Sequence, residues 1–249
     1  METIKDGGTY RTIITDKDKK QLGKLIEVIG PRVEVEELGR YINLFDEEIW
    51  HHIVVQVCVM GSARFMERLE KNDDYKNFKK SVSLKVVTEE KEKAAYLTGI
   101  FEAFKATRFR NKAGQRLADI LSSERVLYNG KIVLLKGLSH KDDFNAVRNE
   151  LQKRCPIFKL KSASDFMISV GLSHDIIALD TRVVGVFNRY LNYETDPGKV
   201  QGNDKIYYSV ETALREFCQE KNVTLALLDR LLFKYGNIDV IDFVLTDPH

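Results

Sequence analysis

The sequence predicts a mostly α-helical globular protein, built as one large domain or as two sub-domains that share a core. The chain of 249 residues has 43% apolar residues and only four prolines, which suits a helical fold with a sizeable core. Apolar residues recur at intervals of three and four through most of its length, as on one face of a helix. Two short alternating stretches near the N-terminus add a small sheet.

Residues 1–44 form an N-terminal segment that we expect to pack on the core. The alternation of Tyr10–Ile14 predicts an edge strand, and the weaker alternation of Val33–Leu44 predicts a second strand. Between them, Asp16–Ile29 has the apolar spacing of a helix, which Gly30-Pro31 ends.

Residues 45–249 form the predicted helical core. A helix starts at Asp46, and its apolar stripe is too wide for a surface helix, so we expect a buried central helix that Gly61-Ser62 ends. Asn129-Gly130 predicts a turn between two short strands. The remaining predicted elements are helices over 63–71, from Thr88 to Lys105, from Asn111 to Leu121, from Ser139 or Lys141 to Leu151, over 208–219 and over 225–235 (closed by Gly236-Asn237), with polar connections at 72–85 and 192–204.

Basic residues are clustered although the net charge is only +2. Lys105–Arg116 holds five basic residues and no acid, and Lys153–Ser162 holds four, again without an acid. Such clusters suit a surface that follows the phosphates of a nucleic acid, and the alternative is an ordinary solvated helix face.

The cysteine pattern indicates reduced thiols. Cys58, Cys155 and Cys218 are far apart and odd in number, which argues for a cytosolic protein without a disulfide framework. No ligand set for a metal or an iron–sulfur cluster is present, so we expect neither metal nor cofactor. No apolar run reaches the length of a membrane span, and no signal peptide is visible, so we expect a soluble, intracellular protein.

The stretch Cys155–Tyr190 organises the rest of the chain. Ala163, Phe166, Met167 and Val170 recur as on one helix face, and the glycine that follows them stops the helix. Asp180 with Thr181 precedes a second apolar helix, as an N-cap should. Lys161 and Asp180 therefore sit nineteen residues apart at the starts of two helices, joined by a short connection.

These residues resemble a known signature. Lys161–Phe166, Val170-Gly171 and Leu179–Val183 are similar to the helix-hairpin-helix (HhH-GPD) DNA glycosylases, with the hairpin at residues 155–171. They are most similar to the bifunctional 8-oxoguanine glycosylase/AP lyases, in particular the small archaeal-type group. The resemblance implies a two-subdomain helical fold. It also implies that Lys161 is the nucleophile and Asp180 its catalytic partner.

Further site residues follow from the same resemblance. Thr107–Ala113 looks like the family loop that enters a helix beside the DNA, and Leu228–Phe233 resembles a C-terminal segment whose aromatic residue stacks on the flipped base. The implied DNA-binding residues are Arg108, Arg110, Asn111, Lys112, Lys159 and Ser162, and the implied base-pocket residues are Phe233 and Asp165. The alternatives are a core position for Phe233 and a surface carboxylate for Asp165.

Two features depart from the family. The family hairpin usually contains glycines, whereas Ile157–Leu160 has none, and the chain continues through Ile238–His249 after the last helix. From the resemblance we nevertheless expect a glycosylase that excises 8-oxoguanine from double-stranded DNA and nicks the strand as a Schiff-base AP lyase. We expect it to be monomeric and to lie in the cytoplasm of a prokaryote, associated with the nucleoid. The alternatives are the same fold acting on another lesion, and a non-catalytic helix-hairpin-helix DNA-binding protein.

Overall fold

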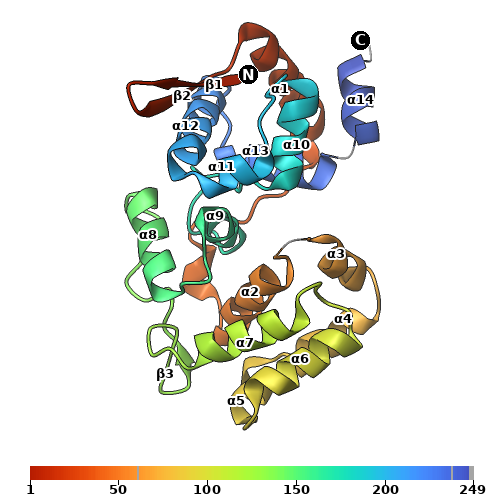
Figure 1. Cartoon of the computed structure of the whole chain (residues 1–249), viewed down its shortest axis with the longest axis vertical. Coiled ribbons are helices and arrows are strands. Elements are labelled where there is room, and N and C mark those ends of the chain that lie inside the picture. Colours follow the sequence, from red (N-terminus) through yellow and green to blue (C-terminus); the bar gives the residue numbers. More distant parts are fainter. Residues whose placement is uncertain (61, 237, 247–249) are drawn as a thin grey trace. The chain divides into compact units, whose positions relative to one another are not determined.

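The computed structural model describes residues 1–60, 62–236 and 238–246. Gly61 and Asn237, two of the expected helix ends, lie outside the described residues. The protein is mostly helical with short strands (Figure 1), which confirms the predicted fold class. Within these ranges, no helix combines the length and the apolar character that crossing a bilayer requires.

The chain forms two compact units. Met1–Leu38 and Leu160–His249 together make the first, which we name the split unit. Gly39–Lys159 makes the second, the inserted unit. These limits do not coincide with the segments 1–44 and 45–249 used for the sequence.

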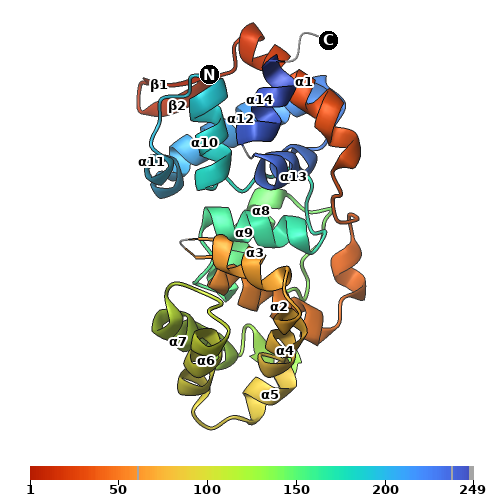
Figure 2. The ribbon, with the colours of Figure 1, turned by 90° about the vertical axis from the view of Figure 1, so that its right-hand side faces the viewer.

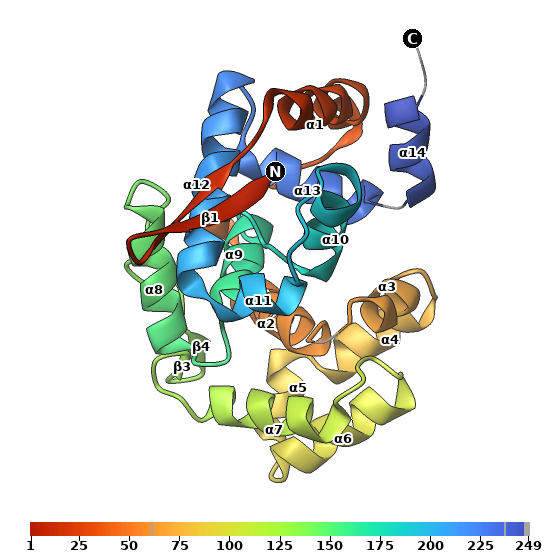
Figure 3. The same cartoon turned by 45° about the horizontal axis from the view of Figure 1, so that its top comes forward.

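The split unit contains an N-terminal hairpin and a group of helices. Its elements are β1 (Glu2–Asp6), β2 (Thr9–Ile13), α1 (Asp16–Ile29), α9 (Leu160–Ser169), α10 (Thr181–Tyr190), α11 (Pro197–Gly202), α12 (Asp204–Glu220), α13 (Leu225–Tyr235) and α14 (Ile238–Thr246). The antiparallel strands pair with Glu2 opposite Ile13. The hairpin lies against α12 (Figure 3), where the hydroxyl oxygens of Thr12 and Ser209 are 2.9 Å apart.

Helix α1 begins at a capping box and joins the core of the split unit. The Thr15 hydroxyl accepts from the Asp18 amide, and the Thr15 amide donates to the Asp18 carboxylate. Leu22 and Leu25 are buried on the same face of the helix as Asp18, and α14 packs on α1 (Figure 2). Other buried members of this core are Val183, Phe187, Val210, Leu214, Phe217, Leu228 and Leu232.

The inserted unit is a helical bundle with one small hairpin. Its elements are α2 (Asp46–Cys58), α3 (Arg64–Glu70), α4 (Asp74–Ser81), α5 (Leu84–Glu89), α6 (Lys93–Ala103), α7 (Arg110–Leu121), β3 (Leu127–Tyr128), β4 (Lys131–Ile132) and α8 (Phe144–Arg154). Helix α2 is the expected buried helix: Trp50 is fully buried, and its indole N–H donates to the Val82 carbonyl at 2.7 Å. Helices α6 and α7 lie side by side (Figure 1), and a Cβ at Gly114 would collide with Thr98 and with the Ala94 carbonyl.

Several predicted elements are wrong. Val33–Leu44 is not a strand, because no described strand offers it a hydrogen-bonding partner, and Gly39 turns the chain with a φ of 92°. The helix expected from Thr88 to Lys105 is two helices, α5 and α6, and Thr88 lies inside α5. Its hydroxyl donates to the Leu84 carbonyl at 2.8 Å instead of capping a helix.

Three connections are helical where loops or a tail were expected. Helix α4 lies within 72–85, where Phe78 provides a buried anchor among charged residues. Helix α11 lies within 192–204 and starts at Pro197, with the Asp196 side chain as its cap. The tail after residue 237 contains α14.

Candidate active site

Helix α9 begins at Leu160, so Lys161 lies in its first turn as expected. The predicted apolar face is buried, and Gly171 ends the helix with a φ of 70°. The Leu172 amide donates to the Met167 carbonyl at 2.8 Å and the Gly171 amide donates to the Ile168 carbonyl at 3.1 Å. These two bonds form a Schellman motif, which only a residue tolerating positive φ completes without strain. The stop predicted at Gly171 is therefore confirmed.

Lys161 carries its amine at the edge of the split unit. Its side chain is 23% exposed, and its Nζ lies 3.4 Å from Oδ2 of Asp165, one turn further along α9. The other oxygen of Asp165 accepts a hydrogen bond of 2.8 Å from Arg230 of α13. Asp165 is thus shared between two cations, and the amine stays accessible from solvent.

Asp180 caps α10, as the sequence predicts. Its Oδ1 accepts from the Val183 amide at 2.8 Å. Burial raises the pKa of Asp180 above its usual value, although the Val183 N–H and the positive charges of Lys161 and Arg182 act in the opposite direction. The Lys161 amine and the Asp180 carboxyl therefore lie within electrostatic range of each other.

The connection between the two helices is held by buried side chains of α12 and α13. Along residues 177–179 the backbone amides donate to Glu211 at 3.3 Å, to Asp229 at 2.7 Å and to the Tyr207 hydroxyl at 3.3 Å. The same hydroxyl donates to the Ile177 carbonyl at 2.6 Å. This irregular segment is buried, so each of these bonds satisfies a polar group that water does not reach. We call Glu211, Asp229 and Tyr207 the clamp, and it fixes the position of Asp180 relative to α9.

Asp229 and Arg230 join this clamp to the lysine. The Arg230 guanidinium contacts the Asp229 carboxylate at 3.0 Å, the Asp165 carboxylate at 2.8 Å and the Ser169 hydroxyl at 2.9 Å. Asp229 is 1% exposed, and burial raises its pKa to about 7, although the Arg230 charge and the Ala178 N–H act to lower it. A continuous chain of polar contacts therefore runs from Lys161 to the backbone of the connection.

Sequence reasoning missed Glu211, Asp229 and Tyr207. A signal for Asp229 was present, because Leu225, Leu228 and Leu232 place it on the buried face of α13. A carboxylate on such a face must find partners, and this one finds the Ala178 amide and Arg230.

Phe233, the predicted stacking residue, is half-buried at the end of α13. The Arg182 guanidinium lies over its ring at 4.8 Å from the centroid, and Arg182 also donates to the Phe233 carbonyl at 3.5 Å. Stacking of a base on this face of the ring would require Arg182 to move. The role of Phe233 in binding a base stays a prediction.

The other predicted DNA-binding residues are divided between the units. The start of α7 in the inserted unit exposes Arg108, Arg110, Asn111 and Lys112. Lys159 is exposed at the C-terminal end of the same unit. Helix α7 begins at Arg110, so Asn111 lies inside the helix and the expected cap at Asn111 is wrong. Arg110 pairs with Glu102 at 2.9 Å. Ser162 lies in the split unit, half-buried beside Lys161. Their contacts with DNA stay predictions.

The described residues contain no group of three histidine, cysteine, aspartate or glutamate side chains suited to hold a metal ion. The three cysteines are buried free thiols. Around Lys161 the split unit offers a partly exposed amine near the half-buried carboxyl groups of Asp165 and Asp180.

Comparison with known proteins places this geometry in a known fold. No protein-family model and no curated protein sequence matches the chain. The chain is similar to the crystal structure of the Methanocaldococcus jannaschii 8-oxoguanine glycosylase/lyase in complex with 15mer DNA containing 8-oxoguanine. The sequence identity is 15% and the TM-score is 0.64, over 87% of this chain and 95% of that one. The chain therefore shares the fold of this glycosylase/lyase.

Proposed function

We propose that the protein is a DNA glycosylase that excises an oxidised purine, 8-oxoguanine, and then nicks the strand as an AP lyase. The observation that carries the proposal is the partly exposed amine of Lys161 in the first turn of α9, in the same unit as the half-buried Asp180 carboxyl that caps α10. The shared fold with a glycosylase/lyase supports it, and so does the position of each group at the start of a helix.

The chemistry needs an amine nucleophile and an anion. The neutral Lys161 amine forms a bond to C1′ of the deoxyribose while the bond from C1′ to the base breaks, and the base leaves with that electron pair and gains a proton. The Asp180 carboxylate stabilises the positive charge that develops on the sugar. Opening of the sugar ring gives an imine between Lys161 and C1′. Loss of a proton from C2′ then expels the 3′ phosphate and breaks the strand.

Borohydride trapping tests the proposal directly. The wild-type protein and Lys161→Gln are incubated with a duplex that contains one 8-oxoguanine, and borohydride reduces any imine to a stable adduct. We expect a covalent adduct with wild type and none with Lys161→Gln. Lys20→Gln, an exposed lysine of α1, removes the same charge from the same unit and should leave the adduct intact.

Other outcomes would change the proposal in defined ways. An adduct on an abasic site but none on 8-oxoguanine would retain the lyase and discard this substrate in favour of another lesion. The absence of an adduct on both substrates, with duplex binding retained, would contradict the lysine chemistry. The protein would then be a helix-hairpin-helix DNA-binding protein without catalysis.

A further inference from the structure

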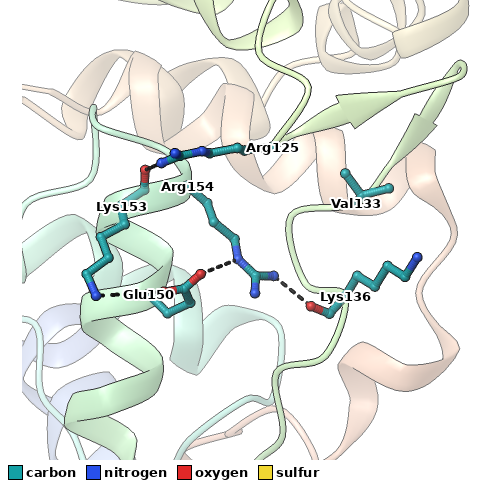
Figure 4. Close-up of a pocket in the computed structure, with 6 residues that line it drawn as sticks. All are labelled: Arg125, Val133, Lys136, Glu150, Lys153 and Arg154. Carbon is teal, nitrogen blue, oxygen red and sulfur yellow. Dashed lines mark hydrogen bonds and ion pairs between the residues drawn. The ribbon is translucent and has the colours of Figure 1, made fainter.

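The inserted unit contains a basic hollow that is separate from the candidate active site. It has a volume of about 550 Å³, and its lining is shown in Figure 4. The lining residues are Arg125, Val133, Lys136, Glu150, Lys153 and Arg154. The lining thus contains four cationic residues and one anionic residue. Lys161, Asp165 and Asp180 are not among the lining residues.

Two arginines hold the hollow together. Arg154, at the end of α8, donates to Glu150 at 3.0 Å and to the Lys136 carbonyl at 2.7 Å (Figure 4). It also donates to the Leu134 carbonyl at 2.9 Å. Arg125 donates to the Lys153 carbonyl at 3.3 Å. These bonds fix the positions of both guanidinium groups, so the positive charge of the hollow is preorganised.

Most of this charge is not neutralised. Lys136 and Arg125 form no ion pair with any residue in the described part of the chain. Lys153 is 71% exposed and lies 3.9 Å from the Glu150 carboxylate. The hydrogen bond from Arg154 holds the pKa of Glu150 below its usual value, with the charges of Arg154, Lys153 and Arg125 acting in the same direction. The local field therefore favours an anion.

We propose that this hollow binds phosphate groups of the DNA backbone. Guanidinium and ammonium groups are the side chains that recognise phosphate, and here they gather around one open depression. Arg125, Lys136 and Lys153 are all exposed, so a phosphodiester chain can approach their charges from solvent. The inference rests on the proposed DNA substrate and is independent of the lysine chemistry.

Equilibrium binding to an undamaged, fluorescently labelled duplex tests this site. The double variant Lys136→Glu/Lys153→Glu is compared with Lys80→Glu/Lys85→Glu, which reverses two exposed lysines of α4 and α5 in the same unit. Both variants change the net charge equally, and both are checked for folding by circular dichroism. For the hollow variant we expect roughly tenfold weaker binding and a salt-dependence slope smaller by about 1–2, as for the loss of one or two phosphate contacts. The control should lie close to wild type, because screening limits surface charges to a range of about 10 Å.

The arms of the experiment separate the possible results. Equal losses in both double variants would overturn the proposal, since they would reflect net charge alone. Binding of tripolyphosphate to the same variants is measured as a second arm. If the hollow variant loses tripolyphosphate binding but keeps duplex binding, the proposal is also overturned, because the hollow would then bind a small anion. A wild-type protein that binds no duplex would remove the proposed function as well. If the double variant does not fold, Lys136→Gln is measured instead, with an expected slope change of about 1.

Discussion

The split unit and the inserted unit use charge in opposite ways. Around Lys161 the charged groups are buried or half-buried and each has a defined partner, with Arg230 at 12% and Asp229 at 1% side-chain exposure. In the inserted unit, Arg110, Lys136 and Lys153 point into solvent. Buried, paired charges fix the distance between reacting groups, whereas exposed charges attract a polyanion from solution. Lysine and arginine side chains thus hold neighbouring carboxyl groups in place in the split unit, and can attract a polyanion in the inserted unit.

The largest expected effect is on excision, from Asp180→Asn. Asparagine caps a helix about as well as aspartate, so stability should change by less than about 1 kcal/mol. The substitution removes the carboxylate that we propose stabilises the sugar cation, so we expect excision to slow by about 10²- to 10⁴-fold. Single-turnover excision of 8-oxoguanine and urea unfolding measure the two effects. If excision slows only as much as the loss of folded protein explains, Asp180 is a helix cap without a catalytic role.

Asp229→Ala should mainly affect stability. It leaves the Ala178 amide without its acceptor and removes one carboxylate from Arg230, both in a buried environment. We expect a loss of about 3 kcal/mol in the free energy of unfolding, measured in urea. Asp229→Asn keeps an acceptor at the same place and should cost about 1 kcal/mol. A neutral effect of Asp229→Ala would show that the clamp contributes no stability.

The same carboxyl predicts a pH dependence. Burial raises the pKa of Asp229 to about 7 in the folded protein, against about 3.9 in an unfolded chain. Between these values the folded state holds a proton that the unfolded state has released. The contribution of Asp229 to stability is thus complete below about pH 4 and is lost as the pH rises to about 7, by at most about 1.4 kcal/mol per pH unit.

Unfolding in urea between pH 4.5 and 7.5 measures this slope. Asp229→Asn cannot titrate, so its stability should decline less over the window than that of wild type. Parallel curves for the two proteins would contradict the raised pKa.

The smallest effect is expected from Arg110→Gln in the inserted unit. Its ion pair with Glu102 is exposed on both sides, so the free energy of unfolding should change by less than about 1 kcal/mol. If Arg110 contacts a phosphate, the salt-dependence slope of duplex binding falls by about 0.9. An unchanged slope would remove Arg110 from the DNA-binding surface.

Local rules predicted much of the fold. Asp16–Ile29 and Leu225–Tyr235 are helices with the predicted limits, and Gly171 and Asp180 act as the predicted stop and cap. These features depend on the spacing of apolar residues and on capping, both of which are local. Val33–Leu44 was wrong because a strand needs a partner distant in the sequence.

The site was predictable only in part. The sequence pattern places Lys161 and Asp180 at the starts of two helices, and the family resemblance suggests their roles. The side chains that hold the connection before Asp180, such as Glu211 and Tyr207, lie more than twenty residues further along the chain in α12. No local pattern connects a buried glutamate of one helix with the amide of an irregular segment elsewhere. Such contacts depend on tertiary packing.

The division of the chain has a consequence for the order of folding. The inserted unit is one continuous stretch, Gly39–Lys159, whereas the split unit needs residues from both sides of it. During synthesis the inserted unit can complete its contacts while α10, α12 and α13 are still unmade, and the N-terminal hairpin must wait for α12. What waits for the closing of this long loop is the packing of the N-terminal hairpin against α12 and of α1 against α13 and α14.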